Sequence, residues 1–166
     1  MEKLRAEGLV KAIGVGSNSS DALVQCVQRS GLDLMMLAGR YTLLEQTAQQ
    51  DLLPACVGYG VGVVNVGVYN SGLLAQARIS DDAHYNYAPA PRKILDHARR
   101  LAACCAEFGV ELPTADLQFS RRHPAVRTVI VGASNPQQIE QNIARMREPV
   151  PEELWEELQR RGLVPA

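Results

Sequence analysis

Small and polar residues collect where four short apolar runs end, at residues 16–18, 38–41, 67–72 and 132–135. In proteins built from alternating strands and helices, ligands bind where the parallel strands end. Glycine there lets the backbone approach a ligand closely, and serine and asparagine supply hydrogen bonds. We therefore expect the four clusters to form one ligand-binding rim.

The last cluster has the most definite chemistry. Asn135 can cap a helix, Pro136 suits its first turn, and Gln138 lies three residues after the cap. Backbone N–H groups at such a helix start attract anions, and barrel enzymes frequently bind phosphate at their last loops. A plain, well-capped helix explains the same residues equally well, so both interpretations stay open.

Histidine and cysteine offer no recognisable acid–base, nucleophilic or metal-binding pattern. The histidines fall in predicted loops or on a helix, where we expect surface or partly buried side chains: His84, His97 and His123. The cysteines lack the C-x-x-C spacing of metal and redox motifs: Cys26, Cys56, Cys104 and Cys105. We expect small, buried, reduced thiols and no metal site.

The elements that would position the rim alternate in type. Short β-rich apolar runs predict strands at residues 12–15, 34–37, 61–66 and 128–131, each buried on both faces. Helical patterns lie between and after them, at residues 22–27, 51–59 and 91–108 and in the spacing of Ile139, Ile143 and Met146. Residues 1–7 resemble the end of a further helix. This order predicts an α/β fold of four parallel βα units.

Two stretches need separate interpretation. The glycines of residues 58–62 resemble a dinucleotide fingerprint, but they end a predicted helix and precede a strand, the reverse of the Rossmann order. We predict a helix C-cap and a tight turn instead. Residues 68–90 form a long irregular region after a strand, which is often functional, although a disordered surface excursion remains the alternative.

Composition sets the broad class. The 166 residues are 46% hydrophobic and 21% charged with a net charge of −1, which fits one globular domain over residues 1–166. So small a charge argues against nucleic-acid or anionic-membrane partners. The charged N-terminus lacks the apolar core of a signal peptide, and no apolar run approaches the roughly 18 residues of a membrane span. We expect a cytoplasmic protein.

Several motifs resemble the aldo-keto reductase family. Residues 5–15, RAEGLVKAIGV, are similar to its EGKVRAIGVSN segment, and residues 60–74 resemble its seventh strand and following loop. Residues 129–133 with Pro136, Gln138 and Asn142 resemble its last strand and the next helix. Residues 37–46 and 85–91 point to the branch of D-threo-aldose 1-dehydrogenase, L-fucose dehydrogenase and pyridoxal 4-dehydrogenase. The similarity spans essentially the whole chain.

The resemblance implies the C-terminal half of a TIM-type (β/α)8 barrel, because a complete barrel needs typically about 250 residues. It also implies a nicotinamide cofactor, NAD or NADP, held at the rim. No Lys or Arg lies between residues 132 and 144 to favour the 2′-phosphate of NADP. The implied cofactor-binding residues are Ser17, Asn18, Tyr69, Asn70, Ser71, Leu73, Gly132, Ala133, Gln138, Gln141 and Asn142.

The resemblance also implies where catalysis comes from. The family uses a tyrosine proton donor, a Lys–Asp pair that lowers its pKa, and a histidine, all from the earlier strands. The sequence shows no such arrangement: its lysines are Lys3, Lys11 and Lys93, and Lys11 begins a strand at the end away from the rim. We therefore predict no catalytic residue, and cofactor binding that is weak or lost in the isolated chain.

Three hypotheses remain at this stage. The first is a truncated NAD(P)-dependent oxidoreductase of the aldo-keto reductase type, whose parent acts on a sugar or another small carbonyl or alcohol. The second is a non-catalytic half-barrel that binds a ligand or self-associates through its open strand edges. The third is the product of an incomplete gene, which aggregates instead of folding.

Overall fold

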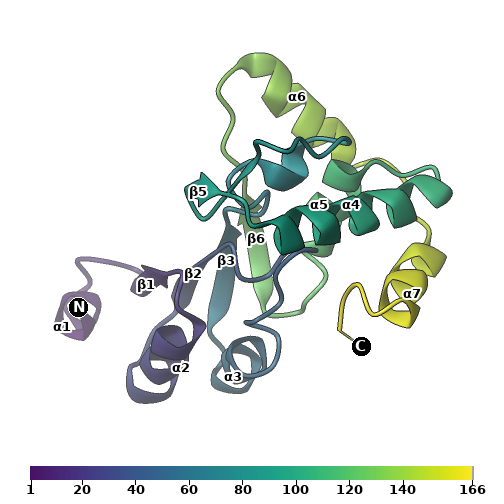
Figure 1. Ribbon diagram of the computed structural model, residues 1–166. Helices are drawn as coiled ribbons and strands as arrows, with labels where there is room; N and C mark the ends of the chain where they lie inside the picture. The colour runs from purple at the N-terminus through teal and green to yellow at the C-terminus, as the bar shows by residue number, and fades with distance from the viewer. Residues whose placement is uncertain (166) are drawn as a thin grey trace.

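The computed structural model describes residues 1–165, in which helices and strands alternate along most of the chain (Figure 1). In chain order the elements are α1 (Glu2–Ala6), β1 (Gly14–Ser17), α2 (Ser20–Arg29), β2 (Leu34–Ala38), α3 (Leu52–Tyr59), β3 (Gly62–Val66), η1 (Leu73–Ala75), β4 (His84–Tyr85), β5 (Ala88–Pro89), α4 (Arg92–Glu107), α5 (Leu112–Phe119), β6 (Val126–Ile130), α6 (Pro136–Arg145) and α7 (Glu152–Arg160).

Four of the strands form a parallel sheet in the order β1-β2-β3-β6. Gly14 of β1 pairs with Leu34 of β2, which in turn pairs with Gly62 of β3, and Val66 of β3 pairs with Ile130 of β6. Each strand lies beside the next one in sequence, and at least one helix fills each crossover. The predicted series of four parallel βα units is therefore confirmed.

Helices cover one face of this sheet. Met35 and Leu37 of β2 and Val63 of β3 are buried on that face, where α2 and α3 contact β1 and β3. Figure 1 shows α2 and α3 side by side on one side of the strands, with α6 at the opposite end of the molecule. Because side chains alternate along a strand, one face of β2 meets the core and the other does not.

The prediction that each strand is buried on both faces is wrong for β1, β2 and β6, whereas β3 has no exposed residue. Leu34 and Met36 of β2 are 39% and 43% exposed, and Ile130 of β6 is 49% exposed. These side chains belong to the face that would line the interior of a closed barrel, and no helix of residues 1–165 covers it. Their apolar character therefore reflects a face that eight strands would enclose.

The core continues from the sheet into α4, α5 and α7. Leu101 of α4 and Leu158 of α7 are fully buried, and α4 contacts both α5 and α7. A row of aromatic rings joins this region to the strand ends: the centroids of Tyr41 and Phe119 are 5.2 Å apart, and those of Phe119 and Trp155 are 6.2 Å apart. The final helix is thereby fixed to the body of the half-barrel.

Local signals place several element ends where we expect them. The Ser19 side chain caps α2 by accepting a hydrogen bond from the Ala22 N–H at 3.3 Å. Gly60 ends α3 with φ of +71°, the left-handed conformation that glycine adopts without strain. The 58–62 stretch is thus a C-cap and turn, as predicted. No helix in residues 1–165 combines the length and apolarity needed to cross a membrane.

Three features differ from expectation. The first strand is Gly14–Ser17 instead of residues 12–15. Residues 112–119 form the helix α5, which the sequence pattern does not single out. The region of residues 68–90, expected to be irregular, contains η1 and the antiparallel hairpin of β4 and β5, with His84 paired to Pro89.

Candidate functional site

The carboxyl ends of β1, β2, β3 and β6 lie along one edge of the sheet, because the four strands are parallel. The turns after β2 and β3 touch there: the Gly39 N–H donates to the Val66 carbonyl at 2.8 Å. Gly39 and Gly67 have φ of +65° and +63°, a conformation that side chains rarely adopt. The predicted glycine-rich rim therefore rests on two turns that need glycine for their shape.

A pocket of about 420 Å³ opens at this rim between the loop after β3 and helix α6. Seven of the residues predicted for cofactor binding line it: Tyr69, Asn70, Ser71, Gly132, Gln138, Gln141 and Asn142. The sequence prediction missed other lining residues, including Gln76, Tyr87 and Arg145. Residues 67–76 and 130–145, more than 50 positions apart in the sequence, thus meet around one cavity.

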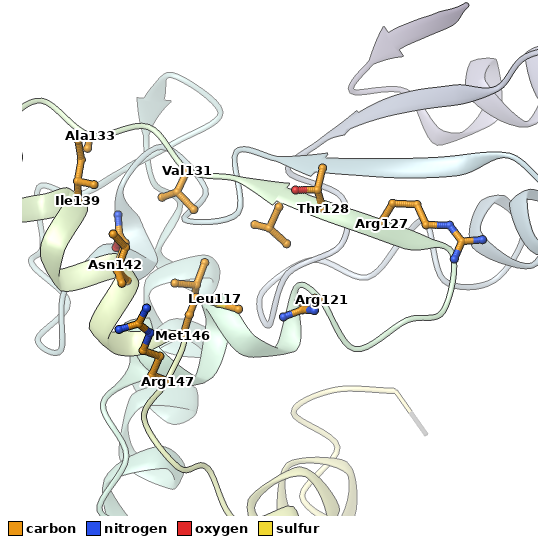
Figure 2. A pocket seen from close by; sticks show the side chains of 12 residues that line it. Leu117, Arg121, Arg127, Thr128, Val131, Ala133, Ile139, Asn142, Met146 and Arg147 are labelled. Carbon is orange, nitrogen blue, oxygen red and sulfur yellow. The ribbon is translucent and has the colours of Figure 1, made fainter. Parts of the chain in front are cut away.

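Four predicted residues lie outside this pocket. Ser17 ends β1 and Asn18 follows it at the other edge of the sheet, three strand spacings from β6, or roughly 14 Å at the usual interstrand distance. Leu73 is 3% exposed and belongs to the core. Ala133 lines a different groove, on the other side of the chain between β6 and α6 (Figure 2).

Tyr69, Asn142 and Arg145 form a polar group on the pocket wall. The Tyr69 hydroxyl donates to Asn142 Oδ1 at 2.9 Å, and Arg145 Nη1 donates to the same oxygen at 3.3 Å. Burial raises the pKa of Tyr69, and the nearby Arg145 charge opposes that shift only in part. Tyr69 therefore keeps its proton and holds the Asn142 side chain as a hydrogen-bond donor.

The side chain of Asn70 is engaged within the protein. It is 4% exposed, its Oδ1 accepts from the Thr42 hydroxyl at 2.7 Å, and its Nδ2 donates to the Gly39 carbonyl at 3.2 Å. Asn70 thus fastens the loop after β3 to the loop after β2. The neighbouring Ser71 Oγ accepts from the Tyr87 N–H at 3.2 Å and connects the β4–β5 hairpin to the pocket.

The start of α6 is capped by its own side chains. Asn135 Oδ1 accepts from the Gln138 N–H at 2.9 Å, and Gln138 Oε1 accepts from the Ser134 N–H at 2.7 Å. This arrangement is close to the capping box that the spacing predicts, except that Gln138 accepts from Ser134, the residue before the cap, instead of from Asn135. It also occupies two of the N–H groups that we expected to meet an anion.

The charge of the pocket suits a phosphate-bearing ligand. Arg145 is the one charged residue among the side chains that line it within residues 1–165, and no carboxylate faces the cavity. The remaining lining groups are amides, hydroxyls, backbone and small apolar side chains. Phosphate oxygens require donors of this kind and an absence of competing negative charge. The residues present therefore fit the phosphate-containing part of a dinucleotide.

A second groove of about 490 Å³ separates β6 from α6. Figure 2 shows Ile139 and Asn142 on the helix opposite Arg127 and Thr128 on the strand. The predicted stripe of Ile139, Ile143 and Met146 does line this groove, but Ile139 and Ile143 are 53% and 48% exposed. Helix α6 therefore leans on α5 and leaves its apolar side uncovered.

Beneath the rim lies a buried carboxyl group. Asp116 of α5 has no exposed surface; its Oδ1 accepts from the Leu43 N–H at 2.9 Å, and its Oδ2 has no hydrogen-bond partner. Burial raises the pKa of Asp116 well above its usual value, and the Leu43 N–H offsets this only in part. The neutral acid is thus the form that the fold favours.

Asp116→Asn is expected to raise the free energy of unfolding at pH 7 by about 1–3 kcal/mol, because the amide keeps the Leu43 contact without a buried charge. The stabilisation that Asp116 provides as a neutral acid is complete below pH ~4, the ordinary Asp pKa, and is lost as pH rises through its raised folded-state pKa. Urea unfolding measured from pH 4 to 8 should show that the free energy of unfolding of the wild type falls, relative to that of Asp116→Asn, as the pH rises. Asp21→Asn, at an exposed helical site, is the control. If the free energies of unfolding of the wild type and Asp116→Asn changed equally with pH, the raised pKa of Asp116 would be contradicted.

No described group has the features of a catalytic tyrosine and lysine pair. Burial raises the pKa of Tyr41 to about 12, and burial together with Glu45 raises that of Tyr85 to about 12. Lys3 lies on the surface, 3.7 Å from Glu7. Burial lowers the pKa of His97 and of His123, and within residues 1–165 no cluster of His, Cys, Asp and Glu is placed to hold a metal.

The cysteines are structural. Cys56, Cys104 and Cys105 are fully buried, and Cys26 is half-buried. Burial raises the pKa of Cys56 to about 11 and that of Cys105 to about 12. Thiolates are the reactive form of cysteine, so these two side chains act as small apolar groups.

Comparison with known proteins gives one consistent family. The sequence model of the Aldo/keto reductase family matches residues 1–161. D-threo-aldose 1-dehydrogenase from Pseudomonas sp. is 47% identical over 165 residues, which cover 99% of this chain and 50% of that protein. Pyridoxal 4-dehydrogenase from Microbacterium luteolum is 37% identical over 164 residues, which cover 99% and 48%. The chain spans about half the length of the curated relatives it matches.

Solved structures agree on the fold. An aldo-keto reductase from Bacillus halodurans, in its holo form, superimposes with a TM-score of 0.72 at 23% identity over 96% of this chain and 52% of that one. A glycerol dehydrogenase from Gluconobacter oxydans also gives 0.72, at 18% identity over 99% and 54%. The predicted half-barrel is confirmed, as are the resemblance and its branch.

Proposed function

Because the chain belongs to the aldo/keto reductase family, we propose that it forms the nicotinamide-dinucleotide-binding half of an oxidoreductase. The observation that carries the proposal is the rim pocket, where seven of the predicted residues meet around a cavity with one cationic side chain and no carboxylate. The bound nucleotide would supply the hydride acceptor or donor. NAD and NADP both remain candidates.

Two groups of residues would hold the two ends of the nucleotide. Tyr69, Gln138, Gln141 and Asn142 of the pocket would hold the adenosine and phosphate end of the nucleotide. Ser17 and Asn18, at the end of β1 on the other side of the rim, would hold the nicotinamide carboxamide. An extended dinucleotide can connect two such distant points. The proposal thus treats residues 1–166 as one partial domain with the cofactor laid across its strand ends.

The chemical step would depend on residues beyond those described here. Proton donation by a family-type tyrosine requires a lowered pKa, whereas Tyr41, Tyr69 and Tyr85 all have raised pKa values. We propose that residues 1–165 carry no catalytic tetrad and turn over no substrate by themselves. The relatives named for D-threo-aldose and pyridoxal suggest a sugar or another small carbonyl or alcohol as the substrate of the complete enzyme.

Fluorescence titration of NADPH and NADH into the folded chain tests the proposal. The double variant Ser17→Ala, Asn18→Ala is expected to weaken binding by about 10-fold, because two hydrogen bonds to the carboxamide are lost. The matched control is Ser30→Ala with Gln28→Ala, two exposed residues of similar polarity at the end of α2. Saturable binding to a folded wild type, reduced in the first variant alone, supports the proposal. No binding to the folded wild type rejects it.

A non-catalytic, self-associating half-barrel is the second candidate function. The exposed face with Leu34, Met36 and Ile130 and the unpaired outer edges of β1 and β6 favour it. Sedimentation of the purified chain distinguishes the two: a stable monomer with cooperative unfolding argues against this alternative.

A further inference from the structure

Arg145 lies at the end of α6 with its side chain half-buried on the wall of the rim pocket. It follows Asn142 by three positions, Gln141 by four and Gln138 by seven, so all four share one side of the helix. The three amides line the same pocket. Helical geometry therefore directs the guanidinium toward the cavity that these amides form.

The Arg145 guanidinium is poorly satisfied by the protein. It carries five N–H donors, yet within residues 1–165 its side-chain partners are only Asn142 Oδ1, at a long 3.3 Å, and the Tyr69 hydroxyl, whose raised pKa it offsets in part. None of the ion pairs of the described chain includes it. Arg122, by contrast, has strong partners: its guanidinium donates to both carboxylate oxygens of Glu152, at 2.9 and 2.8 Å.

Part of the other positive potential near the pocket, at the start of α6, is already in use. The N–H groups of Ser134 and Gln138 at the start of α6 are bound within the capping box. An anion that enters the pocket therefore finds one full charge, on Arg145, with amide and hydroxyl donors around it. A guanidinium binds phosphate through two parallel N–H groups, which makes it well suited to this position.

We propose that Arg145 is the phosphate-binding residue of this pocket and, resting on the proposed function, that it binds a phosphate group of the dinucleotide. It supplies the positive charge that residues 132–144 lack. The 2′-phosphate of NADP and the pyrophosphate shared by NAD and NADP have the same chemistry, so the nucleotide series must separate them.

Arg145→Gln tests the proposal, with Arg147→Gln as its matched control. Arg147 carries the same charge two residues further on but lines the groove between β6 and α6 (Figure 2). Isothermal titration of NADPH, NADH and inorganic pyrophosphate is carried out at two salt concentrations. We expect Arg145→Gln to weaken binding by about 10- to 100-fold and to reduce its salt dependence, Arg145→Lys to retain part of the affinity, and Arg147→Gln to change little.

Each outcome decides the question. Loss for NADPH alone assigns Arg145 to the 2′-phosphate, and equal loss for both dinucleotides assigns it to the pyrophosphate. Unchanged affinity, an equal loss in Arg147→Gln, or weaker binding with unchanged salt dependence overturns the inference and leaves the proposed function intact. Pyrophosphate binding that depends on Arg145, without any dinucleotide binding, rejects the proposed function and retains the anion site. A folded chain that binds none of the three ligands rejects both.

Discussion

Replacing Asn65 with leucine is expected to lower the free energy of unfolding by about 2–5 kcal/mol, because two buried carbonyls lose the Asn65 donor and only the Tyr41 carbonyl keeps another, from the Ser120 hydroxyl at 3.3 Å. Asn65 lies in β3 with no exposed surface, and its Nδ2 donates to the Tyr41 carbonyl at 2.7 Å and to the Ser120 carbonyl at 3.0 Å. A single side chain thus joins a central strand to the rim loop after β2 and to the end of α5. Leucine has the same branching as asparagine but larger end groups, so the loss combines the missing hydrogen bonds with some overpacking.

Urea unfolding followed by circular dichroism measures this change. Thr128→Val in β6 is the control, because it also removes a polar group from a strand but at an exposed position with no side-chain hydrogen bond within residues 1–165. A loss below about 1 kcal/mol for Asn65→Leu would mean that water reaches the two carbonyls, contrary to the burial described above.

Trp155→Ala is expected to cost about 3–5 kcal/mol, the usual range for removing a buried aromatic ring. Trp155 is 7% exposed, its ring centroid lies 6.2 Å from that of Phe119, and the Arg122 guanidinium lies 4.8 Å above it. Arg122 is itself held by both oxygens of Glu152. Removing the ring therefore loosens the whole attachment of α7 to the half-barrel.

Because Trp155 is the single tryptophan of the chain, circular dichroism must replace its fluorescence in this measurement. Glu156→Ala, one residue further along the exposed side of α7, is the control and should change stability by less than about 0.5 kcal/mol. If Trp155→Ala unfolds at the same urea concentration as the wild type, α7 contributes nothing to the cooperative core.

The series of parallel strands was predictable because strands such as β2 and β3 have dense apolar runs, at residues 34–37 and 61–66. Strand β1 was misplaced because Gly16 and Ser17, its last two residues, carry no apolar side chain. Its position depends on tertiary fit: a Cβ at Gly14 would lie 2.6 Å from the Leu34 carbonyl oxygen, so only glycine can pair there. A contact between two strands of this kind cannot be predicted from the sequence pattern of one of them.

Two other elements escaped prediction for definable reasons. Seven of the eight residues of α5 are buried, including Asp116, so the helix lacks the two-sided pattern that identifies amphipathic helices. The β4–β5 hairpin turns at Asn86 and Tyr87, with φ of +49° and +65°. Such turns are recognised by Asn-Gly, and tyrosine at the second position gives no signal.

The candidate site was likewise predictable only in part. The strand ends and the capping box could be predicted from the sequence, since both depend on local spacing. Arg145 was missed because it lies one residue beyond the 132–144 segment, although its helical spacing from Gln138 and Asn142 would have revealed it. The internal use of Asn70 and the separation of Ala133 from the pocket depend on how loops pack, which local spacing does not determine.

The capping box at the start of α6 limits how nucleotide preference can evolve or be engineered. Gln138 faces the pocket and at the same time accepts the Ser134 N–H, so a basic residue introduced there gains a charge but gives up that hydrogen bond, typically about 1 kcal/mol, while the Asn135 cap remains. Arg145 carries no such structural duty. Substitutions that favour one dinucleotide over the other are therefore expected to cost less stability at Arg145, in the last turn of α6, than at Gln138, in its first turn.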